Sequence, residues 1–172
     1  AKAIKIDNGQ AQVISDRCIG CGNCVKVCNQ NAKVYHNSVD HVLELLNSND
    51  KVAACIAPSF PAEFSDNHDY KKVVGMLREA GFDYIHEVAF GADLVALKYK
   101  EILKNVSDSP FISSDCPAIV SYIEKYFPHL TGHLVPVVSP MIATARVISK
   151  KYVNSVKIVF IGPCIAKKSE SD

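Results

Sequence analysis

The feature that most constrains this chain is a set of four cysteines packed into eleven residues. They are spaced C-x2-C-x2-C-x3-C: Cys18, Cys21, Cys24 and Cys28. This spacing suits thiolates that wrap around an iron–sulfur cubane, and Gly20 and Gly22 allow the backbone to turn tightly between them. Zinc sites instead use paired C-x2-C knuckles separated by a longer gap, with histidine as an option. We therefore predict that the four cysteines bind 4Fe-4S clusters of the ferredoxin type.

The four thiolates need not belong to one cluster. In two-cluster ferredoxins the last cysteine of such a run serves the other cluster, so we expect Cys28 to be separate from the first three. Proline usually follows that last cysteine, and Asn29 stands there in this chain. We expect this change to alter the turn and leave ligation intact.

A weak internal repeat extends this interpretation. Aligning Ala3 with Ala32 pairs two β-like stretches, and on that register a further cysteine would lie two positions before Ala1. We therefore expect the chain to be part of a longer protein whose upstream residues complete both clusters.

Composition narrows the class of protein. The chain has 172 residues, of which 48% are hydrophobic and 22% charged, values typical of folded domains. Its long apolar patterns differ from a loop-rich secreted disulfide domain and favour a reduced, cytoplasmic protein with metal-bound thiolates. The net charge of +1 and the lack of a basic patch favour no nucleic-acid partner. No apolar run reaches the roughly 18 residues that a membrane span needs, and the first residues given lack the apolar core of a signal peptide.

Residues 1–50 and 51–172 differ in pattern and predict two domains. The first has short β-like runs and too little apolar mass for a core, so a cofactor would have to act as the core. The runs are Ala3–Ile6, Gln12–Ser15 and Lys33–Tyr35. We predict an α+β, ferredoxin-like Fe–S module here, with a short helix over His41–Asn47 leading out of it.

The second domain alternates β-like runs with helical patterns. The β-like runs are Val52–Ala57, Tyr84–Ala89, Phe111–Ser113 and Val156–Ile161. Between and after them, apolar residues recur at spacings of three and four over 70–77, 95–106, 118–127 and 141–152. This alternation predicts an α/β lobe with a four-stranded parallel sheet flanked by helices.

Chemistry-bearing residues follow several of these predicted strands. Cys116 and Cys164 each lie beside a proline, and Pro58-Ser59 follows the first strand. Open α/β sheets build their binding crevice at the carboxyl ends of the strands. Cysteines often only pack in a core, and Cys55, inside the first strand, is best interpreted so. The equivalent placement of Cys116 and Cys164 favours a site instead.

The motifs of this second domain resemble those of a known family. The stretch from His86 to Glu170 is similar to the first lobe of the catalytic domain of iron-only (di-iron) hydrogenases. Four segments carry the resemblance in order: Val88–Asp93, Ser114–Pro117, Ser139–Pro140, and Pro163–Lys168 with Glu170. The ferredoxin module directly upstream is similar to the accessory domain of that family.

The resemblance implies roles for individual residues. Cys116 and Cys164 would be two of the four cysteines that hold the active-site cubane. Lys167 would donate a charge-assisted hydrogen bond to a cyanide of the di-iron unit, although a lone lysine is more often solvated. Pro58 and Ser59 would line the second cyanide, and Glu170 would support the site from outside its ligands. The reaction would interconvert dihydrogen with protons and electrons.

Three features of the sequence depart from the active members of the family. Asp115 replaces the cysteine that relays the proton, and an unperturbed carboxyl titrates near pH 4 where a thiol titrates near 8.5. Lys98-Tyr99 replaces an acidic pair of the proton path, and Gly162 replaces a bulky methionine. We keep Asp115 and Lys167 as the catalytic candidates and expect a divergent, sensory type of hydrogenase.

The family's remaining two cubane cysteines belong to a second lobe, and the chain holds no such motif. We expect the chain alone to be inactive, with the di-iron cluster present only in the full-length protein. Its partners would be that C-terminal lobe, dihydrogen and protons, and an electron donor or acceptor such as ferredoxin. Two alternatives stay open: an electron-transfer module without catalysis, and a hydrogenase-like Fe–S assembly protein. Lys167 with Pro58-Ser59 favours the hydrogenase over the assembly protein.

Overall fold

The computed structural model describes residues 2–63, 69–104, 110–153 and 155–171, and its contacts define two compact units. We call the first the cysteine unit: Ala1–Tyr35, Val106–Val137 and Cys164–Asp172. We call the second the sheet unit: His36–Asn105 and Val138–Pro163. Six of the seven cysteines belong to the cysteine unit, and Cys55 belongs to the sheet unit. The division of the chain into domains 1–50 and 51–172 stays a prediction.

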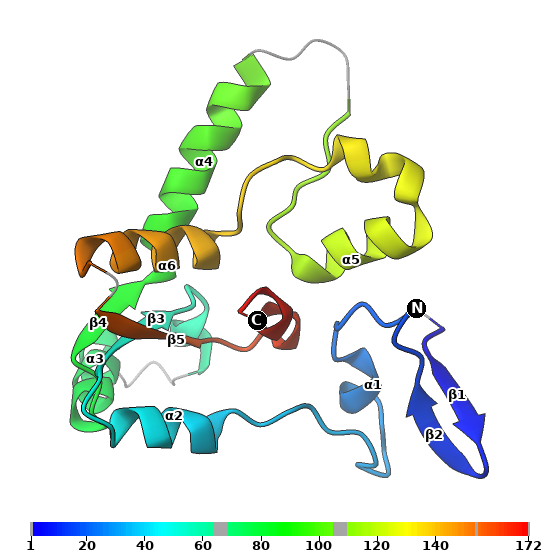
Figure 1. The fold of residues 1–172 in the computed structure, drawn as a ribbon, viewed down its shortest axis with the longest axis horizontal. Helices are drawn as coiled ribbons and strands as arrows, with labels where there is room; N and C mark the ends of the chain where they lie inside the picture. Colours follow the sequence, from blue (N-terminus) through cyan, green and yellow to red (C-terminus); the bar gives the residue numbers. More distant parts are fainter. Residues whose placement is uncertain (1, 64–68, 105–109, 154, 172) are drawn as a thin grey trace. The chain divides into compact units, whose positions relative to one another are not determined.

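The sheet unit is built on a three-stranded parallel sheet in the order β4-β3-β5 (Figure 1). Its strands are β3 (Lys51–Ile56), β4 (Tyr84–Glu87) and β5 (Val156–Ile161). The register pairs Cys55 with His86 on one side and with Phe160 on the other. β3 is paired along both edges and side chains pack on both of its faces, so from Val52 to Ile56 its residues are at most 1% exposed.

Helices cover both faces of this sheet (Figure 1). The elements around it are α2 (Val39–Leu46), η1 (Phe60–Glu63), α3 (Tyr70–Glu79), α4 (Val88–Lys104) and α6 (Pro140–Lys151). On one face Ala53 and Cys55 pack with Val88 of α4 and Ile148 of α6. On the other face Val52 and Ala54 pack with apolar side chains of α2 and α3. The sheet unit therefore has a conventional apolar core.

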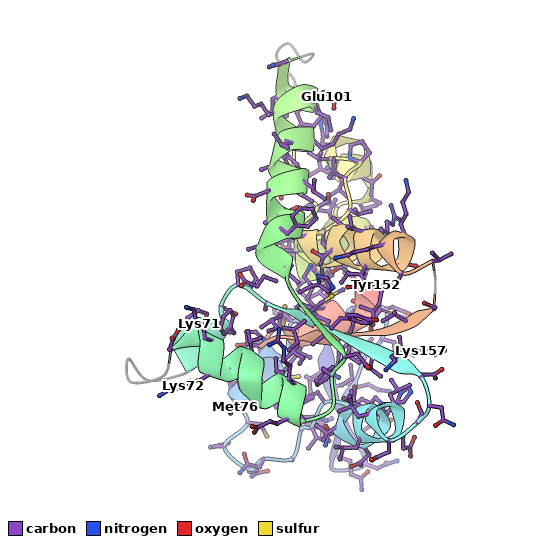
Figure 2. The ribbon with its side chains drawn as sticks, turned by 90° about the vertical axis from the view of Figure 1, so that its left-hand side faces the viewer. Lys71, Lys72, Met76, Glu101, Tyr152 and Lys157 are labelled. Atoms are coloured by element: carbon purple, nitrogen blue, oxygen red, sulfur yellow. The ribbon has the colours of Figure 1, made fainter. Side chains whose placement is uncertain are left out.

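Local sequence explains how two of these helices begin. Ser139 caps α6 by accepting a hydrogen bond from the amide of Ile142, and Pro140 occupies the first turn, where no amide donor is needed. Asp69 caps α3 in the same way through the amide of Lys71. Figure 2 shows Lys71, Lys72 and Met76 on the outer side of α3, away from the sheet.

Helices α4 and α6 approach each other closely at Gly91. A Cβ atom at this position would overlap the carbonyl oxygen of Pro140 and Oγ1 of Thr144. Thr144 donates a hydrogen bond to that same carbonyl, at 2.9 Å. The Gly91-Ala-Asp segment is therefore a packing site between two helices.

The cysteine unit is made of short elements. They are β1 (Ile4–Asp7), β2 (Gln10–Val13), α1 (Asn23–Lys26), α5 (Pro117–Tyr126), η2 (Pro128–His133) and η3 (Ile165–Glu170). β1 and β2 form an antiparallel hairpin through Asn8-Gly9 (Figure 1). Both turn residues have positive φ, at 49° and 77°, as an Asn-Gly hairpin turn requires.

The predicted fourth strand does not join the sheet. At Phe111–Ser113 only Ile112 makes a β-bridge, to Leu134, and both residues belong to the cysteine unit. The bridge consists of two backbone hydrogen bonds, from the amide of Ile112 to the carbonyl of His133 at 2.8 Å and from the amide of Val135 to the carbonyl of Ile112 at 2.9 Å. The prediction of four strands was wrong for the described residues.

Two further boundaries differ from expectation. β4 ends at Glu87, and α4 takes up Val88 and Ala89, which were predicted as strand. Lys33–Tyr35 is not a strand, and Val34 is 87% exposed. Within the described residues, no helix combines the length and the apolar composition needed to cross a bilayer.

Candidate functional site

The loop that carries the first four cysteines follows the hairpin directly. The amide of Cys18 donates to the carbonyl of Ile14, at 2.9 Å, which turns the chain back after β2. Gly20 and Gly22 both have positive φ, at 67° and 73°, and Gly22 is the N-cap of α1. This conformation strains residues that carry a Cβ atom, so glycine suits both positions. The tight turns predicted at the two glycines are confirmed.

All seven cysteines of the chain are free thiols. Cys28 accepts a hydrogen bond from the amide of Ala32, with 3.3 Å between nitrogen and sulfur. This amide, more than any other group, lowers the pKa of the Cys28 thiol. An amide aimed at a sulfur favours the thiolate, the form that binds metal. The turn over residues 28–32 therefore directs a backbone amide at the Cys28 sulfur, and ligation by Cys28 stays a prediction.

The thiols of this loop fit an iron–sulfur cluster in their chemistry. Cys21 is exposed and the other three are partly exposed, so none is sealed in an apolar core. Within the described ranges, histidine, cysteine and carboxylate side chains do not gather in groups of three or more around one point. The fit therefore rests on free thiols, left-handed glycines and an amide directed at sulfur.

The second pair of cysteines lies elsewhere in the same unit. Cys116 is the N-cap of α5 and Cys164 is the N-cap of η3, both with extended backbone and both exposed. Cys116 therefore follows the Ile112 bridge and not a strand of the sheet, whereas Cys164 follows β5, three residues after its end. Helices α5 and η3 contact each other.

Lys167 ties the two cysteine segments together. Its ammonium donates to the carbonyl of Asp115, at 2.8 Å, and to Oε2 of Glu170, at 2.6 Å. The Lys167 side chain is only 14% exposed and that of Glu170 19%. Lys167 is thus a held cation next to Cys116, and the alternative of a solvated lysine is wrong.

Hydroxyl groups brace the loop that precedes Cys116. The carboxylate of Asp115 accepts a hydrogen bond from Ser113, at 2.7 Å. The hydroxyl of Ser114 lies 2.7 Å from the carbonyl oxygens of Val135 and of Val137. Sequence reasoning missed the two serines as positioning groups, and only their place beside Asp115 and Cys116 could have pointed to them.

Pro58 and Ser59 belong to the sheet unit, where they follow β3 and are exposed. The carbonyl of Ser59 accepts a hydrogen bond from Ala62, at 3.0 Å, which begins the η1 turn. This placement at the carboxyl end of the central strand fits a crevice position. Their role beside a cyanide stays a prediction.

Gly162 leaves no space of its own. A Cβ atom there would lie 2.7 Å from Cζ of Phe160 and 2.8 Å from Cβ of Ala57. Phe160 therefore occupies the space that a side chain at position 162 would need.

The predicted core role of Cys55 is confirmed, since it is 1% exposed and burial raises the pKa of its thiol to about 11.

Comparison with known families places both parts of the chain. Residues 11–33 match the 4Fe-4S binding domain, and residues 50–172 match the C-terminal domain of the iron-only hydrogenase large subunit. The NADP-reducing hydrogenase subunit HndD of Solidesulfovibrio fructosivorans is 28% identical over 89% of this chain. Iron hydrogenase 1 of Clostridium pasteurianum is 32% identical over 78%. The cytosolic Fe-S cluster assembly factor NAR1 of Encephalitozoon cuniculi is 27% identical over 99%.

The chain spans less than a third of the two hydrogenases, 30% and 27% of their lengths, and 47% of that assembly factor. Solved structures share its fold. The FeFe-hydrogenase HydA1 of Chlamydomonas reinhardtii, in a form without its cofactor, superposes with a TM-score of 0.64 at 24% identity, over 80% of this chain and 40% of that one. The chain is a hydrogenase-like iron–sulfur protein, and it belongs to the iron-only hydrogenase large-subunit family.

Proposed function

We propose that the chain forms the electron-input module and first catalytic lobe of an iron-only hydrogenase of divergent, sensory type. In this proposal the thiolates of Cys18, Cys21 and Cys24 hold one 4Fe-4S cluster and Cys28 serves a second. Cys116 and Cys164 supply two ligands to the active-site cubane. The bound clusters would relay electrons, and the di-iron unit would interconvert dihydrogen with protons and electrons.

The observation that carries this proposal is the position of Lys167. Its ammonium links the segment before Cys116 to the segment after Cys164 through the carbonyl of Asp115 and the carboxylate of Glu170. An ammonium has three donors, and these contacts use two of them. The third donor would serve an anionic ligand of the di-iron unit, beside both proposed cubane ligands.

The proposed sensory character rests on Asp115. The carboxylate of Asp115 accepts a hydrogen bond from Ser113, and it stands where active members of the family carry a thiol, so we expect slower proton transfer at this position. Lys98 pairs with Glu101, at 2.9 Å, where the family carries an acidic pair for the proton path. We therefore expect slow turnover that suits detection of dihydrogen, with electrons passed to a redox partner such as ferredoxin in the cytoplasm.

A second candidate is a hydrogenase-like Fe–S assembly protein without a di-iron unit. It is favoured by the similarity to NAR1 assembly factors, which extends over 99% of the chain in one case and 94% in another. It gives no role to Lys167 as a partner of cyanide. A third candidate, an electron-transfer module alone, leaves both Lys167 and the Cys116–Cys164 pair without a function.

Infrared spectroscopy of the full-length protein, matured with the di-iron cofactor, separates these candidates. We expect carbonyl and cyanide bands, a shift of a cyanide band in Lys167→Met, and slow hydrogen evolution. Asp115→Cys should raise the rate of hydrogen evolution by ten-fold or more, since it restores a matched proton donor. A matured protein that shows neither band set would contradict the hydrogenase proposal and favour the assembly role. Rapid turnover by the unmodified protein would contradict the sensory role.

A further inference from the structure

The last turn of α5 holds the segment that leads into the first cysteine. The ammonium of Lys125 donates to the carbonyls of Ser15 and Cys18, at 2.8 Å and 2.6 Å. Its neighbour Tyr126 donates its hydroxyl to the carbonyl of Arg17, at 2.9 Å. These three bonds join residues 107 to 110 positions apart. We call Lys125 and Tyr126 the α5 clasp.

The clasp is mounted on a fixed element. Helix α5 buries Ile123 and starts directly after its N-cap, Cys116. It contacts η3, which starts directly after its N-cap, Cys164. A second contact fixes the other side of the cysteine loop, because a Cβ atom on Gly22 would lie only 2.6 Å from Cδ1 of Ile165. The loop is thus held at its start by α5 and in its middle by η3, all within the cysteine unit.

The two members of the clasp differ in charge. Tyr126 gives a neutral hydrogen bond, whereas Lys125 gives two charge-assisted ones. The ammonium is bound to the carbonyl of Cys18 itself, so its positive charge lies next to a proposed cluster ligand. Reduction of a 4Fe-4S cluster adds one negative charge, and a cation nearby favours the reduced form. Lys125 is exposed, so solvent and salt weaken this effect without removing it.

We propose that Lys125 is a positioning residue for the cluster of the cysteine loop: it fixes the Cys18 backbone and raises the reduction potential of the cluster. This inference rests on the proposed ligation by Cys18, Cys21 and Cys24. Tyr126 fixes the same segment without contributing charge. Through the clasp, the helix that follows Cys116 sets both the order and the potential of the electron-input loop.

The test uses the full-length protein with its clusters reconstituted. Redox titration followed by electron paramagnetic resonance gives the midpoint potential of each cluster in Lys125→Met, Lys125→Gln, Lys125→Arg and Tyr126→Phe. Lys150→Met, in the last turn of α6 in the sheet unit, is the matched control for loss of one surface lysine. Hydrogen exchange at residues 15–18 reports the order of the loop in the same samples.

We expect a more negative potential for one cluster in Lys125→Met and Lys125→Gln, recovery in Lys125→Arg, and a smaller difference at high salt. Tyr126→Phe should speed exchange at residues 15–18 and leave the potential nearly unchanged. Lys125→Gln keeps a donor to the carbonyls, so it tests the charge even if Lys125→Met fails to hold the cluster. Equal potentials in the unmodified protein and Lys125→Gln, or an equal shift in Lys150→Met, would overturn the inference alone. An unmodified protein that takes up no cluster would overturn the proposed ligation as well.

Discussion

Apolar side chains are buried in the sheet unit but mostly exposed in the first 35 residues of the cysteine unit. β3 is sealed from Val52 to Ile56 between helices on both faces. Among residues 2–35, by contrast, only Ala3 is buried, and Ile6 and Val34 are 71% and 87% exposed. The first region is stabilised by its own apolar core. The second must gain its stability from something else, and its four free thiols indicate a cluster.

This difference matters for function. An electron-transfer loop must bring its cofactor close to the surface, so it gives up apolar burial for ligation. The sheet unit instead positions loops at the carboxyl ends of its strands and needs a rigid core to do so. A change in core packing should therefore destabilise the sheet unit and have little effect on the first 35 residues. Loss of iron should have the reverse effect.

The largest effect should come from a truncation in β3. Ile56→Ala removes a side chain that is 1% exposed and should lower the free energy of unfolding of the sheet unit by about 2–5 kcal/mol. Ile6→Ala is the matched control in β1, and its effect should stay within about 0.5 kcal/mol. Hydrogen exchange in denaturant, read at β3, measures both changes. A similar loss in the two variants would remove the contrast between the regions.

A smaller effect tests the packing of α4 on α6. Gly91→Ala forces a methyl group against Pro140 and Thr144 and should destabilise the sheet unit by about 1–3 kcal/mol. Gly75→Ala is the control, since Gly75 lies inside α3 with nothing within 4 Å of an added Cβ atom. That variant should stabilise the unit by roughly 0.5–1 kcal/mol through helix propensity. The unfolding temperature should therefore fall in Gly91→Ala and rise in Gly75→Ala. An unchanged unfolding temperature in Gly91→Ala would contradict the close approach of α4 and α6.

The smallest expected effect is the change in stability of the sheet unit as the pH falls. Burial, followed by the charge of Lys151, lowers the pKa of His86, whose Nε2 lies 3.4 Å from the hydroxyl of Tyr152, the C-cap of α6. The unfolded chain binds this proton more tightly, so stability is lost as the pH falls from about 6.5 through the lowered pKa.

His86→Gln should remove that part of the pH dependence, as measured by urea unfolding at pH 7.5 and 5.5. Asp83 contributes to stability in a different pH range and serves as the comparison. Its pKa is lowered first by the Lys51 side chain and then by the amide of Val52. Its contribution is present above about pH 4 and is lost only as the pH falls through the lowered pKa. An unchanged pH dependence in His86→Gln would contradict a role for this histidine.

The comparison also shows what the sequence could predict. Strands β3 and β5 and helices α3, α5 and α6 lie where apolar spacing predicted them, because burial on a defined face leaves a clear pattern. The start of α4 was missed, since the run from Val88 to Phe90 is apolar in either state. In the structure Val88 packs with Cys55 of β3 and Ile148 of α6, and such tertiary contacts leave no local signal.

The candidate site also has a part that the sequence predicted and a part that it could not predict. The spacing of the cysteines and the Cys-Pro motif indicated which residues carry chemistry, and these are local signals. The bond from Lys167 to Asp115 and the α5 clasp join residues 52 and more than 100 positions apart. No local pattern predicts such pairs, because they depend on how α5 and η3 pack. The fourth strand failed for the same reason, since Ile112 pairs with Leu134.

The most direct test of this account compares the cluster-loaded and iron-depleted forms of one full-length protein by hydrogen exchange. We predict that residues 4–28 are more strongly protected when iron is bound, and that β3, β4 and β5 are protected equally in both forms. Cys21→Ser should reproduce the iron-depleted pattern in the cysteine loop. Equal protection of residues 4–28 with and without iron would contradict the central claim that a cluster takes the place of the core in this region.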